Sequence, residues 1–180
     1  MRISSFHPAW CAAIALAVLV VPMYAVGAQG VNISMKAWRE PVLMDTLRQE
    51  HEVKAAPGQV YQAALKAFAD LGVPTGRTDG TRGIIGSERF ERINSLAGSP
   101  MSRSFTCGEG PTGPYADSFR LEIAVVAWVS PADGGTTKLG LAAIASGRDV
   151  TGVGRNPKEC VSTGALEIKL LDRITKIVGG

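Results

Sequence analysis

The chain has 180 residues, of which 46% are hydrophobic, 19% charged and 6% aromatic, and its formal net charge is +3. This composition is typical of one globular domain, and it excludes a collagen-like repeat, a coiled coil and a wholly disordered chain, because the 21 glycines and 10 prolines follow no period. The small net charge argues against a nucleic-acid binder, which needs a concentrated basic face.

Residues 1–28 have the features of a secretory signal peptide. Arg2 supplies a positive start, an uncharged apolar run extends from 11 to 21, and Pro22 then breaks any helix. Small residues ending at Ala28 fit the site of a signal-peptidase cut. The alternative is a single N-terminal membrane anchor, since the uncharged stretch is just long enough to span a bilayer.

Export would leave 152 residues with 18 basic and 16 acidic side chains, and with two of the three cysteines. Because an even number of cysteines in an oxidising compartment favours pairing, we expect a disulfide between Cys107 and Cys160. Two buried free thiols are the alternative. The sequence therefore predicts a periplasmic or secreted protein without a membrane span after cleavage.

The first part of the exported chain is expected to be irregular. Residues 29–41 show no sustained period and are predicted to form a linker or irregular arm, which leaves residues 42–180 as a single α+β domain. The segment 42–54 alternates in its second half, which favours a strand there. The clearest helix is predicted for 57–71, because Pro57 suits a first turn and apolar residues recur every three or four positions.

Short extended segments are expected next. Residues 83–93 are predicted to pair back across a turn at 79–80, and 103–107 to form another short strand. The stretch 108–113 matches G-x-G-x-x-G, but Pro111 removes one amide donor, and Pro114 and Tyr115 are expected to lead into a strand and not into a helix. We therefore expect a surface loop there and no cofactor.

The strongest strand is predicted for 118–130, and 138–146 alternates in the same way after a turn, so the two form an antiparallel hairpin. A polar loop is expected at 147–159, and the last helix is predicted to open at 160–162. Two amphipathic helices need one sheet face to cover, which predicts a two-layer α+β sandwich with both helices on one face of an antiparallel sheet. The expected core is Leu65, Phe68, Leu121, Ile123, Leu141, Leu170 and Ile174.

Three apolar side chains lie on the hairpin face that is otherwise patterned as polar, namely Val126, Trp128 and Ile144. They form either a second small core beneath a loop or an exposed patch with a polar rim, which would mark a contact site. Our hypothesis is the second possibility, in which the hairpin's outer face around Trp128 binds an envelope protein.

Catalytic chemistry finds little support in the sequence. His51 is the only histidine left after export, and between Glu50 and Glu52 it is more readily a solvated strand residue than a general base. Solvated faces also explain the carboxylates that could pair for acid–base work, which are Glu88, Glu91, Asp117, Glu122 and Glu167. No metal ion is expected.

Three functions remain open. The first is an exported, non-enzymatic interaction or structural module. The second is a carrier for a small apolar ligand, and the third is a hydrolase that uses His51. The carrier would need a cavity between helices and sheet, lined by Phe68, Phe119 and Leu141.

Four short segments carry a resemblance to a known family, namely 60–65 (VYQAAL), 71–73 (LGV), Asp79 and 83–85 (GII). They resemble the opening of exported bacterial domains of the type of the BamC lipoprotein from the outer-membrane assembly machinery. The resemblance implies a non-enzymatic envelope domain of the helix-grip type, in which a helix precedes two antiparallel strands. This chain has no lipid-attachment box, so membrane tethering is not carried over, and no functional residue is transferred.

Overall fold

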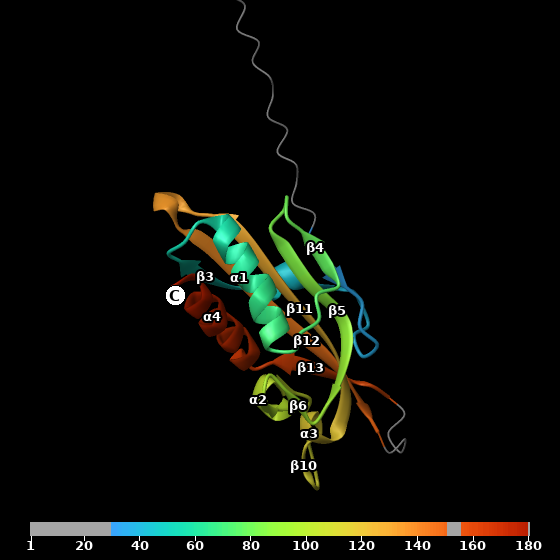
Figure 1. Ribbon diagram of the computed structural model, residues 1–180. Coiled ribbons are helices and arrows are strands. Elements are labelled where there is room, and N and C mark those ends of the chain that lie inside the picture. The colour runs from blue at the N-terminus through green and yellow to red at the C-terminus, as the bar shows by residue number, and fades with distance from the viewer. Residues whose placement is uncertain (1–29, 151–155, 180) are drawn as a thin grey trace, which may run out of the picture.

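The computed structural model describes residues 30–150 and 156–179, so the predicted signal peptide lies outside the described residues (Figure 1). Its centre is a seven-stranded sheet in the order β4-β5-β11-β12-β13-β8, in which β3 also pairs with β12. The pairings are antiparallel, which confirms the α+β class with an antiparallel sheet. The strands are β3 (Gln49–Val53), β4 (Arg77–Asp79), β5 (Ile84–Ile93), β8 (Phe105–Thr106), β11 (Phe119–Pro131), β12 (Thr137–Asp149) and β13 (Lys158–Ser162).

The hairpin of β11 and β12 is the longest pairing in the sheet. It runs from Phe119 opposite Asp149 to Pro131 opposite Thr137, and a short 3₁₀ turn at Asp133–Gly135 connects the strands. Because side chains alternate along a strand, this register places the odd-numbered residues of both strands on one face. The odd-numbered residues 119–129 and 139–145 belong to the larger apolar cluster, so the predicted hairpin and its faces are confirmed.

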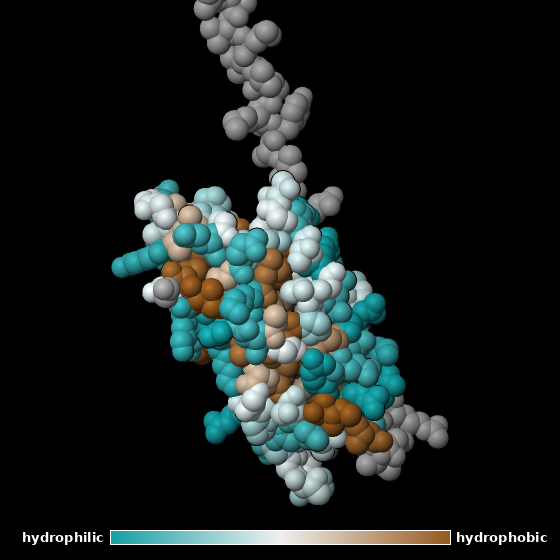
Figure 2. Space-filling model, in the orientation of Figure 1, coloured by the Kyte–Doolittle hydropathy of each residue, from teal (hydrophilic) through white to brown (hydrophobic). Residues whose placement is uncertain are grey.

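The helices α1 (Pro57–Asp70) and α4 (Ala165–Val178) share this cluster, and Figure 1 shows them side by side in front of the sheet. The space-filling view from the same side shows hydrophilic and intermediate residues over most of this face and hydrophobic residues in smaller patches (Figure 2). Six of the seven expected core residues are fully buried, whereas Leu65 is partly buried. Between the helices, Arg173 Nε donates to Asp70 Oδ2 at 2.7 Å, and this bond lowers the pKa of Asp70.

The second face of the sheet is covered by the segment at residues 30–47, which we call the arm. Within it, β1 (Asn32–Ile33) pairs with β2 (Val42–Leu43), and the 3₁₀ helix η1 (Met44–Leu47) follows. Polar contacts fix the arm, because Val31 N donates to Asp45 Oδ2 at 2.7 Å and Ala37 N donates to Ser146 Oγ at 3.1 Å. Residues 30–41, which were expected to belong to a linker or irregular segment, are therefore part of a packed layer of the fold.

The burial of Val126, Trp128 and Ile144 corrects the expected exposed patch. Their exposed fractions are 0%, 7% and 1%, because the arm covers them. The arm contributes four buried side chains to this second cluster, namely Val31, Ile33, Met35 and Met44. The alternative of a second small core beneath a loop is the arrangement observed, and the face around Trp128 is not free to bind a partner.

The end of the chain also differs from expectation. The segment predicted as a polar loop contains the end of β12 and the start of β13, and β13 continues through the residues predicted to open the last helix. The helix begins only at Ala165, after Gly164 with a φ of +85°. That left-handed backbone suits glycine and cannot be part of a right-handed helix, so it sets the start of α4.

Two one-turn helices, α2 (Met101–Ser104) and α3 (Tyr115–Ser118), occur where loop or strand was expected. Two short hairpins accompany them, β6 (Ser95–Leu96) with β7 (Ser99–Pro100), and β9 (Glu109–Gly110) with β10 (Gly113–Pro114). The glycine-rich stretch at 108–113 therefore includes a tight hairpin that leads into α3. Local turn chemistry of this kind leaves no long hydrophobic pattern that would predict it.

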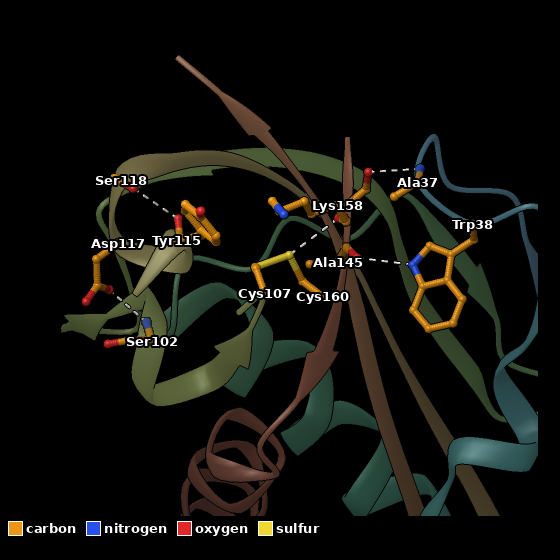
Figure 3. The surroundings of a disulfide bond; sticks show 11 residues. Ala37, Trp38, Ser102, Cys107, Tyr115, Asp117, Ser118, Ala145, Lys158 and Cys160 are labelled. Carbon is orange, nitrogen blue, oxygen red and sulfur yellow. Dashed lines mark hydrogen bonds between the residues drawn. A yellow bond between two sulfur atoms is a disulfide. The ribbon is translucent and has the colours of Figure 1, made fainter. Parts of the chain in front are cut away.

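A disulfide joins Cys107 and Cys160, whose sulfur atoms are 2.01 Å apart across 53 positions of sequence (Figure 3). Both residues are buried, and the bond connects the end of β8 to β13 in the sheet, whereas the start of the last helix was expected at that position. A buried disulfide is typical of proteins that fold in an oxidising compartment. Within residues 30–150 and 156–179, no helix combines the length and the apolar content that crossing a membrane would require.

Candidate binding pocket at the sheet edge

One edge of β12 changes partner halfway along the strand. Its residues Thr137–Leu141 pair with β3, and its residues Ile144–Gly147 pair with β13. Ala142 and Ala143 lie between the two pairings. Because a buried backbone N–H without an acceptor is costly, this interruption requires an acceptor from elsewhere in the fold.

Glu167, in the first turn of α4, supplies that acceptor. Its side chain is only 1% exposed, and its carboxylate accepts hydrogen bonds from the amide of Ala143 and from Ser162 Oγ, the latter at 2.8 Å. Ser162 Oγ in turn accepts from the amide of Gly164 at 3.0 Å. Burial raises the pKa of Glu167 above its ordinary value, because desolvation outweighs these hydrogen bonds.

A cavity of about 230 Å³ lies beside this carboxylate, between the arm on one side and α4 on the other. Its apolar wall includes Leu47 and Val161, which are large side chains that remain 43% and 48% exposed. Glu167 is the only ionisable side chain among the residues that line it. The cavity thus combines an exposed apolar wall with one buried acid.

The indole of Trp38 forms another part of the wall. Figure 3 shows this ring on the opposite side of β12 from the disulfide, with its nitrogen directed at the strand. Trp38 Nε1 donates to the carbonyl oxygen of Ala145 at 3.2 Å. This bond fixes the orientation of the ring, so the aromatic surface of the pocket is formed before any ligand arrives.

The raised pKa of Glu167 predicts a specific pH dependence of stability. The folded protein keeps a proton that the unfolded chain releases at lower pH, so the corresponding stabilisation is complete below the ordinary glutamate pKa and is lost as the pH rises through the raised pKa. Glu167→Gln has nearly the same shape but does not titrate. Its free energy of unfolding, relative to that of the wild type, is therefore expected to increase as the pH rises from about 4 to about 8.

Urea unfolding at a series of pH values measures this difference. The matched control is Glu159→Gln, since Glu159 is an exposed acid on β13. A Glu167→Gln curve that runs parallel to the wild-type curve over the whole range would contradict the effect of desolvation.

His51 lies in β3 opposite Leu139, as a half-buried residue whose Nε2 is buried and has no hydrogen-bond partner among the described residues. His51 is therefore a strand residue, as predicted. Its Nε2 is buried, however, whereas a solvated side chain was expected. The flanking carboxylates point to the other face of the strand and have other partners. Glu50 pairs with Arg48 at 2.6 Å, and Glu52 accepts from Thr136 Oγ1 at 2.6 Å. Neither of these two carboxylates orients the imidazole.

The residues proposed to line a carrier cavity are part of the main core. Phe68 and Leu141 have no exposed surface and Phe119 is 8% exposed, and all three belong to the cluster between helices and sheet. The space that the carrier hypothesis required is therefore filled by side chains. This finding corrects the assignment of those residues to a ligand cavity.

Among the other carboxylates, Glu91 and Glu122 stand opposite each other on β5 and β11. Arg120 pairs with Glu91 at 3.4 Å, and the hollow beside these residues measures only about 20 Å³. A space of that size accommodates roughly one water molecule and no substrate. Glu88 likewise pairs with Arg77 at 3.4 Å, and Asp117 accepts from the amide of Ser102 at 2.8 Å.

Sequence reasoning missed the pocket because it assigned Glu167 to a solvated helix face. A signal was present, since Glu167 is the first residue of the spacing i, i+3, i+4, i+7 whose other members are Leu170, Leu171 and Ile174. An acid in an apolar stripe is a candidate for burial. The alternation of Val31, Ile33 and Met35 was a similar signal for the arm.

A comparison of the chain with protein-family models found no matching family, and a search of curated proteins found no similar sequence. The functional conclusion therefore depends on the geometry of the pocket and on the chemistry of the residues that line it.

Proposed function

We propose that the protein is an exported, non-enzymatic interaction module of the cell envelope, and that it binds a partner protein through the pocket beside Glu167. The observation that carries this proposal is the exposure of Leu47 and Val161 at a cavity of about 230 Å³. Exposed apolar side chains gathered at a concave site are characteristic of contact surfaces.

The size of the cavity supports a protein partner over a cofactor. Pockets for small-molecule ligands usually measure roughly 300–1,000 Å³, whereas this one suits a single inserted side chain. The fixed indole of Trp38 adds an aromatic wall, and aromatic residues are enriched where binding energy concentrates. A side chain anchored in such a pocket is the usual centre of an interface.

Export is supported by the N-terminal pattern and by the disulfide. In this proposal α1, α4 and the sheet act as a two-layer sandwich, closed on its second face by the arm, and the scaffold keeps the pocket walls in place. The role matches that implied by the resemblance to BamC-type envelope domains, although no residue is transferred from them.

Val161→Asp is expected to abolish partner binding, because it places a charge on the apolar wall beside a buried acid. The measurement is site-specific photo-crosslinking from position 47 in cells that export the full chain. We expect one cross-linked product in the wild type and at least a tenfold loss in the variant, a change that corresponds to about 1.4 kcal/mol.

The matched control is Ile93→Asp, which makes the same exchange at an exposed apolar residue on β5, two strands away from β12. It should leave the cross-linked product unchanged. If position 47 yields no product, or if Val161→Asp cross-links as well as the wild type while remaining folded, the proposal is wrong.

A further inference from the structure

The buried carboxylate of Glu167 has only neutral hydrogen-bond donors. Ser162 Oγ and backbone amides contact it, and none of the ion pairs found within the described parts of the chain includes it. Acidic side chains are almost never fully buried unless they are paired. An acid that is 1% exposed, lines a cavity and has no cation beside it has lost its hydration without gaining an ion pair, so its charged form is disfavoured until a cation is placed next to it.

We infer that the pocket receives a lysine or arginine side chain of the partner protein, with its cationic group at the Glu167 carboxylate and its methylene stem along Leu47 and Val161. This inference deepens the proposed function and rests on it. Lysine and arginine bury their stems against apolar surfaces while their charged ends find a polar contact, which matches a pocket with apolar walls and one acid.

Three features favour a basic side chain over a neutral or acidic one. The lining contains no cation that would repel it, and Glu167 is the only ionisable group in the lining that can pair with it. A charge-assisted hydrogen bond to a carboxylate is roughly twice as strong as a neutral one. Because Glu167 itself is buried, the attraction is screened less than it would be at the surface, whereas an acidic side chain would meet a like charge. An aromatic or aliphatic side chain would leave the carboxylate unpaired.

The test compares three probes with one apolar body and different head groups, namely pentylammonium, 1-pentanol and pentanoate. Nuclear magnetic resonance of the full exported chain follows the indole N–H of Trp38 and the amide N–H of Ala143, which both lie at the pocket. We expect pentylammonium to bind at least tenfold more tightly than 1-pentanol, and pentanoate to bind more weakly than either.

Glu167→Gln should reduce the affinity for pentylammonium to that for 1-pentanol and leave 1-pentanol unaffected. Glu159→Gln, the exposed acid on the same strand as Val161, is the matched control and should change neither affinity. If Glu167→Gln does not fold, the relative affinities of the wild type for the three probes still test the inference. Equal binding of the amine and the alcohol to the wild type, or an amine affinity that survives folded Glu167→Gln, would overturn the inference.

The two proposals fail in distinguishable ways. If Val161→Asp abolishes cross-linking but the wild type does not prefer the amine, the pocket binds its partner without a cation and only this inference is lost. If the amine preference is present but cross-linking is insensitive to Val161→Asp, the pocket recognises a cation and the partner protein binds elsewhere.

Discussion

Replacing Trp128 by alanine is expected to lower the free energy of unfolding by about 3–5 kcal/mol, the range for truncating a large buried aromatic residue. The indole is only 7% exposed and packs in the cluster between the sheet and the arm. The guanidinium carbon of Arg48 lies 5.7 Å from its ring centroid, which adds a cation–π contact that alanine loses. The substitution removes the largest side chain of that cluster, so the arm should also detach more readily.

Urea unfolding measures the loss of stability, and limited proteolysis within residues 30–47 measures the detachment of the arm. The control is Leu43→Ala, since Leu43 belongs to the arm but is 38% exposed, and its truncation should change the free energy of unfolding by no more than about 0.5 kcal/mol. A Trp128→Ala protein as stable as the wild type would mean that the side chain is an exposed contact residue after all.

Removal of the disulfide is expected to cost about 4 kcal/mol. The bond closes a loop across 53 positions, and the chain-entropy model assigns roughly this value to a loop of that length. The bond also attaches the edge of the sheet to its middle, because Cys160 pairs with Ala145 of β12 and Cys107 directly follows the edge strand β8. Without the bond, the unfolded chain gains freedom and the β8 edge loses its covalent attachment to the sheet.

Cys160→Ser, studied by urea unfolding, should show this loss, and Cys107→Ser should show the same one. The double variant should match the single variants and should not respond to a reducing agent, whereas the wild type should be destabilised by it. Two thiols that react with an alkylating reagent in native, exported protein would show that the bond does not form.

The local pattern of the sequence was sufficient for the main elements. Pro57 and the apolar spacing after it predict α1, and strict alternation predicts β11 and β12 with their inward face. These segments are long and amphipathic, so their pattern determines both the type of element and the side that it buries. The cysteine pair was predictable as well, because the third cysteine, Cys11, lies in the predicted signal peptide and an oxidising compartment favours a disulfide between the other two.

Tertiary structure alone decided what covers the second sheet face and where the pocket forms. The apolar character of Trp128 is the same whether it faces solvent or the arm, and only the path of residues 30–47 across the sheet distinguishes the two. The pocket depends on the change of partner along β12 and on the left-handed Gly164, which together place Glu167 beside the Ala143 amide that neither β3 nor β13 pairs with. The apolar spacing that follows Glu167 indicates that this acid is buried, but the position of the pocket follows from contacts between residues far apart in the chain, which the pattern of one segment does not determine.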